Sequence, residues 1–467
     1  MSKLAADLRA AIWASGLKDG MCISFHHHLR SGDFVLNMVM DEIAAMGIKD
    51  LTINASSIHD GHRPLIEHMK SGTVTGLETN YIGPAVGKAV SEGVLKNPVV
   101  FRTHGRRPSD IETGISVIDV AFIAAPTADH MGNCTGKVGK SACGTLGYAF
   151  ADAMHAKKVV VITDNLAAYP LTDYSISEIY VDTVVCVEAI GNPAGIVSGT
   201  TRMPKDPIAL KIAGYAAKAI DASGYLKDGF SFQTGAGGAS LAVAAYIKDI
   251  MLKKEIKGSY ALGGITGYIV DLLESGCFEA IQDVQCFDLK AVESVRNNPK
   301  HIEITASHYA SPTAKSTAAA SLDVVVLGAT QIDTEFNVNV HTDSKGYIIG
   351  GSGGHTDVAE CARLTVIVGP LSRARLSLIV DRVDCISTPG SSVDLLVTQY
   401  GMAVNPRREE LKEKLKSAGL PVKEIGELKT IAEKLNGIPK IKAQKKEQVV
   451  ATVLNRDGSV LDHIYQV

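Results

Sequence analysis

The sequence predicts an α/β protein of two similar halves with mainly parallel sheets, followed by a small C-terminal extension made of a helix and a hairpin. Three observations lead to this prediction. Short Val/Ile-rich runs alternate with longer helical patterns, which is typical of parallel βα units. Several of these runs recur in the same order later in the chain. The length of 467 residues, 46% of them hydrophobic, is enough for two large cores.

The recurring runs define the expected strands of the two halves. Residues 22–25 correspond to 230–233, 118–123 to 322–327, and 158–163 to 363–368. The first pair precedes helical patterns over 33–46 and 239–254. The offsets are near-constant, 207 residues from Ser24 to Ser231 and 204 from Asp119 to Asp323. Val-rich runs recur by chance in every α/β protein, but the shared order favours a duplication.

Turn residues place the boundary between the halves near 220–229, where Gly224 and Gly229 each follow polar residues. The expected domains are 1–224, 225–406 and an extension over 407–467. Within the extension, 407–417 has a charged helical pattern and 440–446 is a basic connector. Residues 449–454 and 460–466 flank Asp457 and Gly458, which predicts a hairpin.

Charge and composition exclude several classes of protein. A net charge of -3 supplies no basic field for nucleic acid. The first residues lack the order of a secretory signal, and polar residues interrupt the longest charge-free stretch, so neither export nor a membrane span is expected. The eight cysteines contain no C-x-x-C pair, which indicates free thiols in a cytoplasmic protein.

Two glycine-rich turns carry the most specific local signals. Each follows an apolar run and precedes a helical pattern, over 239–254 and 358–364. Backbone N–H groups at such turns face the carboxyl edge of a parallel sheet, where they can stabilise an anion or oxyanion, although one such turn can also serve close packing alone. The candidate residues are Gln233, Gly235, Gly237, Gly238, Gly351, Gly353, Gly354, His355 and Asp357. Their spacing matches neither the nucleoside triphosphate nor the dinucleotide pattern.

The first half contributes basic candidates after its strands. Residues 26–28 are three histidines, but consecutive side chains leaving a strand alternate in direction, so a shared metal ion is not predicted. We expect this turn, with His26, to line the sheet edge. His104, Arg107 and Arg202 could hold a carboxylate, or could lie in solvated loops.

These residues resemble a known family. Stretches at 332–339, 350–357 and 397–403 are similar to the second domain of CoA transferases. Those at 232–235, 238–243, 261–266, 336–340, 388–394 and 403–406, with 24–27 and 37–41 in the first half, are similar to the citrate lyase alpha subunits within that superfamily. The resemblance covers nearly the whole chain. It implies two tandem CoA-transferase-type domains and an enzyme that exchanges acetyl for citryl on a carrier thiol, giving citryl-carrier and acetate.

The resemblance also implies partners and roles. It implies a citrate lyase beta subunit, a gamma acyl-carrier subunit whose phosphoribosyl-dephospho-CoA arm (or CoA) is a substrate, an oligomer, and no covalently bound cofactor or metal. The amides of Gly353 and Gly354 are the expected oxyanion donors. Asn337 and Asn339 join the other glycine-turn residues at the CoA-like arm, and the basic candidates of the first half are expected at citrate.

One position departs from the broader superfamily. Many CoA transferases carry a nucleophilic Glu where this chain has Gly263 and Gly264. We therefore expect no covalent nucleophile, and attack by a citrate carboxylate on the acetyl thioester within a ternary complex. Two alternatives stay open: a CoA transferase for another short carboxylate, and a non-catalytic subunit that only binds the carrier.

Overall fold

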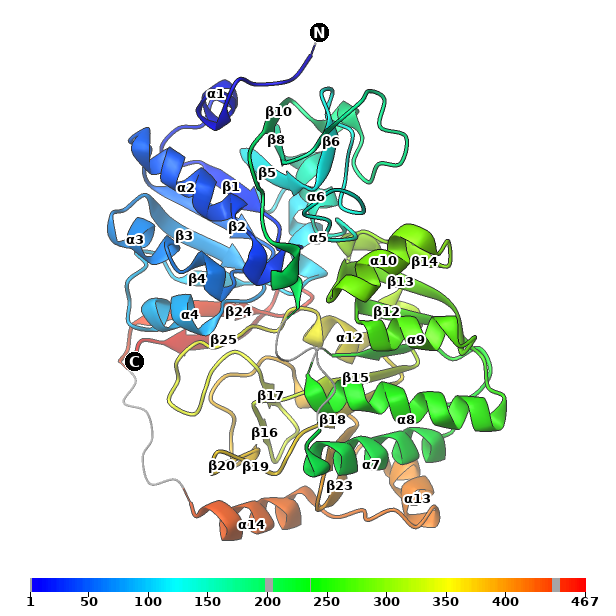
Figure 1. The fold of residues 1–467 in the computed structure, drawn as a ribbon. Coiled ribbons are helices and arrows are strands. Elements are labelled where there is room, and N and C mark those ends of the chain that lie inside the picture. The colour runs from blue at the N-terminus through cyan, green and yellow to red at the C-terminus, as the bar shows by residue number, and fades with distance from the viewer. Residues whose placement is uncertain (1, 198–204, 236, 439–445) are drawn as a thin grey trace.

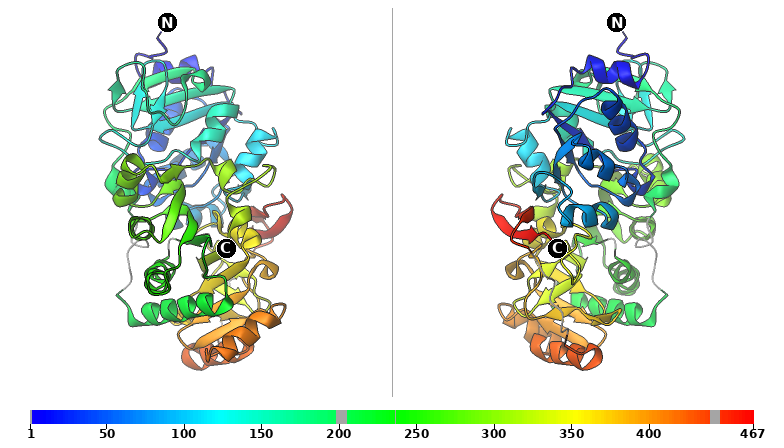
Figure 2. Two further views of the ribbon diagram at one scale, coloured as in Figure 1. Left: turned by 90° about the vertical axis from the view of Figure 1, so that its right-hand side faces the viewer. Right: turned by 90° about the vertical axis from the view of Figure 1, so that its left-hand side faces the viewer.

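Two parallel sheets form the centres of two units stacked on each other (Figures 1 and 2). The computed structural model describes residues 2–197, 205–235, 237–438 and 446–467. The first sheet has nine strands in the order β10-β8-β5-β1-β2-β3-β4-β24-β25, and the second has eight in the order β14-β13-β12-β11-β15-β18-β22-β23. Only the pairs β24–β25 and β22–β23 are antiparallel within these two sheets. The predicted α/β class is confirmed.

The strands are short, and most are apolar. The first sheet contains β1 Cys22–Phe25, β2 Leu51–Ala55, β3 Val74–Thr79, β4 Val99–Phe101, β5 Val120–Ala125, β8 Lys158–Thr163, β10 Thr183–Cys186, β24 Val449–Leu454 and β25 Val460–Tyr465. The second contains β11 Phe232–Thr234, β12 Gly258–Ile265, β13 Phe278–Cys286, β14 His301–Glu303, β15 Val324–Gly328, β18 Leu364–Val368, β22 Leu395–Thr398 and β23 Gly401–Val404. Smaller sheets are built from β6 Thr127–Asp129, β7 Cys134–Thr135, β9 Leu166–Ala167, β16 Gln331–Asp333, β17 Val338–Asn339, β19 Ser372–Arg373, β20 Leu376–Ser377 and β21 Ile379–Val380.

Helices cover both faces of each sheet, and every residue of β5 and β18 is therefore buried. The helices of the first unit are α1 Leu8–Ala14, α2 Val35–Ala45, α3 Leu65–Lys70, α4 Pro84–Ser91, α5 Arg106–Glu112 and α6 Ala149–His155. Those that follow are α7 Pro207–Ser223, α8 Gly238–Lys254, α9 Gly267–Glu274, α10 Leu289–Asn297, α11 Ala306–Ala310, α12 His355–Cys361, α13 Glu409–Ser417 and α14 Ile425–Asn436.

The two sheets share one strand order. From β10 to β4 the order is β10-β8-β5-β1-β2-β3-β4, and from β22 to β14 it is β22-β18-β15-β11-β12-β13-β14. Equivalent carboxylates also bond to the backbone at the equivalent strands β1 and β11. Asp119 accepts from the Cys22 N–H at 2.8 Å, and Asp323 accepts from the Ser231 N–H at 2.9 Å. The duplication stays a prediction, and this correspondence supports it.

The parts of the C-terminal extension pack on different units of the protein. Helices α13 and α14 pack on the second unit, against α7 and β23. The hairpin β24–β25 instead joins the first sheet, where β24 pairs in parallel with β4 (Figure 1). The predicted hairpin and the helix over 407–417 are confirmed, while most of the basic connector over 440–446 lies outside the described residues. Helix α7, assigned to the first domain from the sequence, packs on α8, β18 and β22.

Local sequence explains where the long helices begin and end. Asp206 accepts from the backbone N–H groups of Ile208 and Ala209 at the start of α7, and Gly224 ends that helix with φ of +85°. The helix expected over 358–364 begins earlier, at His355. All eight cysteines are free, and Cys186 is exposed. Among the described residues, no helix combines the length and apolar character that crossing a bilayer requires.

Candidate functional site

The second glycine turn fits against the carboxyl ends of the first sheet. We call residues 350–354 the glycine loop. Gly353 accepts from the His104 N–H at 2.8 Å and donates its own N–H to the Asn80 carbonyl at 3.2 Å. A Cβ on Gly351 would lie 2.2 Å from that carbonyl, and Gly353 has φ of +52°. Only glycine fits this approach of one half to the other.

Gly354, at the end of the glycine loop, lies close to side chains of the second half. A Cβ at this position would lie 2.4 Å from the Tyr309 hydroxyl oxygen. Gln233, on β11, donates to the same oxygen at 3.0 Å, and a Cβ on Gly263 would lie 2.8 Å from the Gln233 side chain. Within the described part of the chain, the Gly354 N–H donates no hydrogen bond, whereas that of Gly353 is used. Of the two expected oxyanion donors, Gly354 is therefore the free one.

Imidazoles gather beside this loop, at the carboxyl ends of β1, β2 and β4. The histidine cluster consists of His26, His27, His28, His59 and His104. The His27 ring stacks on His104 with centroids 5.8 Å apart and lies 5.6 Å from His59. His26 and His28 face each other through their Nδ1 atoms at 2.8 Å. Tyr148, from the start of α6, lies 4.5 Å from the His104 ring.

Burial keeps the histidine cluster neutral. It lowers the pKa of His26 to about 4 and, with the nearby Arg107 charge, that of His104 to about 3. The pKa values of His27, His28 and His59 are also well below the usual range for the same reason. A neutral imidazole offers both a hydrogen-bond donor and an acceptor, so the cluster can hydrogen-bond a polar ligand at neutral pH.

Several buried polar atoms at this junction have no hydrogen-bond partner among the described residues. In the first half they include His59 Nε2 and His104 Nδ1. In the second half they include Gln233 Oε1 on β11, Ser240 Oγ in the first turn of α8 and Thr266 Oγ1 directly after β12. Buried polar atoms are normally paired, and a set of unpaired ones at one junction indicates a place for a polar ligand.

Arg107 is placed elsewhere, inside the first half. Its guanidinium donates to both carboxylate oxygens of Asp152, at 2.8 and 3.1 Å, and to the Asn54 side chain at 2.6 Å. Burial raises the pKa of Asp152 to about 6, and the Arg107 charge opposes this rise. Arg107 thus fastens α5 to β2 and α6. Arg202 lies outside the described residues.

Asn337 and Asn339 also have internal partners. Asn337 donates to Asp333 at 3.1 Å and accepts from the Gly390 N–H at 2.9 Å. The first half repeats this turn, since Asn133 donates to Asp129 at 2.9 Å. Asn339 is fully buried; it donates to the side chains of Gln331 and Thr342 and accepts from the N–H groups of His341 and Thr342. Both asparagines stabilise loops that support the site.

His355 and Asp357 begin α12 behind the glycine loop. His355 bonds to Thr388 Oγ1 at 2.8 Å and to the Gly328 carbonyl at 3.0 Å, and burial lowers its pKa to about 4. Asp357 accepts from the Thr103 hydroxyl at 2.7 Å and from a first-half backbone N–H at 2.9 Å, and burial raises its pKa to about 7. Asp357 therefore joins the two halves.

The first glycine turn lies at the start of α8. Gly235 donates its N–H to the Val326 carbonyl at 2.8 Å, so this amide serves strand packing. Gly237 is the residue before the helix, and Gly238 is its first residue. The Gly237–Gly238 backbone thus lies at a helix N-terminus, next to the unpaired Ser240 hydroxyl.

One group of side chains has the composition of a metal site. Asp283, Cys286 and His301 are buried with their ligand atoms within 4.8 Å of one another. One Asp283 oxygen already accepts from the Cys286 thiol at 3.1 Å and from His301 Nε2 at 3.0 Å, and His301 Nδ1 bonds to Ser294. Burial raises the pKa of the Cys286 thiol well above its usual value. The three groups satisfy one another as a closed hydrogen-bond network.

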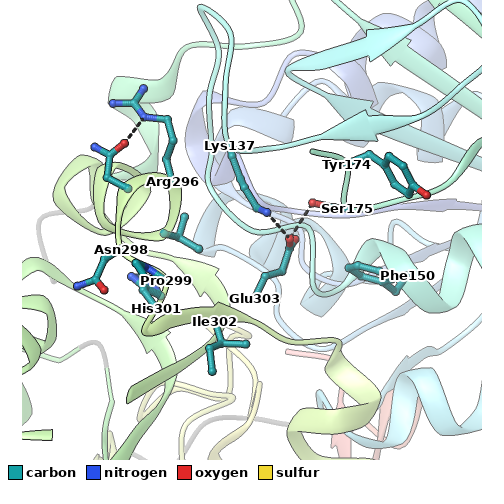
Figure 3. Close-up of a pocket in the computed structure, with 12 residues that line it drawn as sticks. Lys137, Phe150, Tyr174, Ser175, Arg296, Asn298, Pro299, His301, Ile302 and Glu303 are labelled. Carbon is teal, nitrogen blue, oxygen red and sulfur yellow. Dashed lines mark hydrogen bonds and ion pairs between the residues drawn. The ribbon is translucent and has the colours of Figure 1, made fainter. Parts of the chain in front are cut away.

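A hollow of about 550 Å³ opens at the junction, away from the glycine loop (Figure 3). Figure 3 shows Glu303 between Lys137 and Ser175. Glu303 accepts from Ser175 at 2.8 Å and from the Leu146 N–H at 2.6 Å, and Lys137 lies 3.8 Å away. Burial raises the pKa of Glu303. These partners make Glu303 a further link between the halves.

The chain matches one family and several known proteins. The family model described as "Citrate lyase, alpha subunit (CitF)" matches residues 1–467. The citrate lyase alpha chain of Escherichia coli (strain K12) is 48% identical over 465 residues, which cover 100% of this chain and 91% of that protein. A Streptococcus mutans protein described as an alpha subunit of citrate lyase in complex with citrate has a TM-score of 0.98 at 49% identity, covering 100% of this chain and 92% of that one. A Pseudomonas malonate decarboxylase chain, from a hetero-tetramer in complex with malonate, has a TM-score of 0.69 at 16% identity, covering 94% of this chain and 88% of that one, and shares the fold.

Proposed function

The chain belongs to the citrate lyase alpha subunit family, and we propose that its acyl transfer takes place at the junction between the glycine loop and the histidine cluster. The activity is the exchange of acetyl for citryl on a carrier thiol within the citrate lyase complex. The proposal rests on the unpaired polar atoms that both halves contribute to this junction. Such atoms suit a substrate with several carboxylate and hydroxyl oxygens.

The carrier's thioester enters from the side of β11 and β12. Gln233, Ser240 and Thr266 present unpaired oxygens there, and the start of α8 presents backbone N–H groups. We assign the phosphoribosyl-dephospho-CoA arm of a gamma acyl-carrier subunit to this side, with the reacting carbonyl at the Gly354 N–H. An oxyanion formed there would be stabilised by that preorganised amide.

A nucleophile from the enzyme has no room where the superfamily resemblance would put it. A Cβ on Gly263 would lie 2.8 Å from Gln233, and a Cβ on Gly264 would lie 2.2 Å from the Phe287 ring. A citrate carboxylate therefore attacks the acetyl thioester, forming a citric–acetic anhydride and releasing the carrier thiolate. The thiolate then attacks the citryl carbonyl of the anhydride and acetate leaves. The protein positions both substrates and stabilises each oxyanion.

The product, citryl-carrier, is the substrate of a beta subunit that splits the citryl thioester. The proposal thus includes a gamma and a beta subunit as partners of this chain, and a cytoplasmic location. His26 and His104 are assigned to citrate, whereas Arg107 and the two asparagines support the site from behind.

The test is thioester exchange by the purified chain. With acetyl-carrier or acetyl-CoA as donor, citrate should be the preferred acceptor over acetate, butyrate and malonate. Substitution of His104 by Ala should lower kcat/KM for citrate. His130→Ala, which changes a half-buried histidine that lies outside the cluster and packs against Tyr169, should not. Preference for another acceptor, or absence of exchange by a folded chain, would contradict the proposal.

A further inference from the structure

Arg30 is a cation at the junction that nothing in the described structure neutralises. It begins the short 3-10 helix η1, Arg30–Gly32, two residues after the last histidine of the run. Among the described residues, no carboxylate lies within 4 Å of its guanidinium, whose one hydrogen bond is 3.3 Å long, to the Ile196 carbonyl. Arg30 is half-buried, and the two arginines buried in this half are both paired: Arg102 with Glu78 and an aspartate, and Arg107 with an aspartate.

The guanidinium is held in place although it lacks an ionic partner. It lies over the Phe287 ring, 4.7 Å from the centroid, so it crosses from the first half to the second. The Arg30 backbone has φ of +52°, a left-handed conformation that costs a non-glycine residue about 1 kcal/mol. Backbone strain of this kind concentrates at functional sites, where it fixes the direction of a side chain.

The surroundings of Arg30 are those of the proposed site. Its positive charge contributes to the low pKa values of His27 and His59, and His59 Nε2 is buried without a partner. Phe287, beneath the guanidinium, is the ring that fills the space beside Gly264. Arg30 therefore lies between the histidine cluster and the position that lacks an enzyme carboxylate.

An anion is the ligand that this arrangement fits. Burial lowers the pKa of the half-buried Arg30, but a guanidinium stays charged at neutral pH, and this unpaired charge gains from a counter-ion. A carboxylate matches the two parallel N–H bonds of a guanidinium. Phosphates of a CoA-like arm offer the same charge, but the pantetheine chain separates them from the thiol that must reach Gly354.

We propose that Arg30 binds a carboxylate of citrate and selects a polycarboxylate acceptor over a monocarboxylate. This proposal rests on the citrate transfer argued above. One carboxylate pairs with the guanidinium, His59 Nε2 donates to the same anion, and a second carboxylate of the same citrate is left to attack the thioester. An acceptor with a single carboxylate cannot occupy both positions at once. Arg30 is thus the residue that distinguishes citrate from acetate.

The experiment compares Arg30→Met and Arg30→Lys with wild type in the full chain. Arg30→Met should lower kcat/KM for citrate about 100-fold, the usual effect of removing one partner of a buried charge pair. Exchange of labelled acetate with the acetyl donor should change less than about threefold, because acetate does not need the guanidinium. Arg30→Lys should recover part of the citrate activity. The matched control is Arg63→Met, an exposed arginine of the same half, with unchanged kinetics.

Direct binding separates this inference from the proposed function. Calorimetric titration of citrate into the chain, without any acyl donor, should show weaker binding to Arg30→Met and unaltered binding to Arg63→Met. Citrate kinetics and affinity equal to wild type in a folded Arg30→Met protein would overturn the assignment. A rise in KM for the acyl carrier alone would assign Arg30 to the arm instead, and would also overturn it. Failure of wild type to transfer acyl groups, with citrate binding intact, would contradict only the proposed function.

Discussion

Replacing Gly354 by Ala tests whether the glycine loop acts in the transfer. The added methyl carbon would lie 2.4 Å from the Tyr309 hydroxyl oxygen and 3.0 Å from its Cε1. Carbon contacts are comfortable at about 3.5 Å or more, so the loop or the tyrosine must move by about 1 Å. A displacement of this size at a reacting centre costs about 100-fold in rate, or about 2.7 kcal/mol.

The assay is steady-state citryl transfer from acetyl-carrier, with thermal unfolding as the test of folding. We expect kcat/KM to fall about 100-fold in Gly354→Ala, with a small loss of stability from the weakened Gln233–Tyr309 hydrogen bond, worth about 1 kcal/mol. Gly328→Ala is the matched control, because a Cβ there meets no atom within 4 Å. It should retain wild-type activity.

A double-mutant cycle identifies the cause. Tyr309→Phe removes the hydroxyl that the methyl group would meet, so Gly354→Ala should cost much less in the Tyr309→Phe background than in wild type. Equal effects in both backgrounds would refute the steric reasoning. Wild-type turnover by a folded Gly354→Ala protein would remove the loop from the mechanism.

Three further outcomes follow from the site. Initial rates with both substrates varied should give intersecting double-reciprocal lines, and borohydride added with the acyl donor alone should not inactivate the enzyme; parallel lines with a labelled Glu would indicate a covalent intermediate. The folded-state pKa values of His26 and His104, about 4 and about 3, lie below the ordinary 6.5. The contribution of each histidine to the free energy of unfolding is therefore complete above pH 6.5 and is lost as the pH falls toward 4. Each loss amounts to about 2 kcal/mol of unfolding free energy at pH 5 relative to pH 7. The free energy of unfolding measured in urea should therefore depend less steeply on pH for His104→Gln than for wild type. Equal pH slopes for the two proteins would contradict this. Hydrogen exchange with a carrier analogue should show simultaneous protection of 350–357 and 104–107, and protection of only one half would mean that the site is not shared.

The sequence predicts the architecture well because strand and helix patterns are local. Apolar runs such as 158–163 gave the strands with accurate bounds, since buried parallel strands have continuous apolar side chains. The glycine loop was also predictable as a close approach, because clustered glycines permit one, although the apolar run 347–349 before it forms an isolated bridge at Ile348 and no strand. Helix α14 was not predicted, and α12 begins earlier than expected.

Side-chain roles were less accessible to the sequence, because they depend on distant partners. An arginine after a strand could bind substrate or pair internally, and only the fold brings Asp152 onto Arg107 while leaving Arg30 without an acid. Tyr309 and Tyr148 belong to no motif, and they reach the site through α11 and α6. His59 lies shortly after the apolar run that forms β2, and this position near a strand end is the one signal that could have found it.

The pairing of β24 with β4 has a consequence for how the protein is made. Translation delivers β4 early, yet the strand that covers its free edge is synthesised only after the whole second unit. Until then the first sheet exposes an unpaired edge, a template for wrong pairing with other nascent chains. When the hairpin docks, the polypeptide has passed through the second unit and returned to the first. Strands made after the second unit thereby complete the sheet that was begun before it, which joins the two halves.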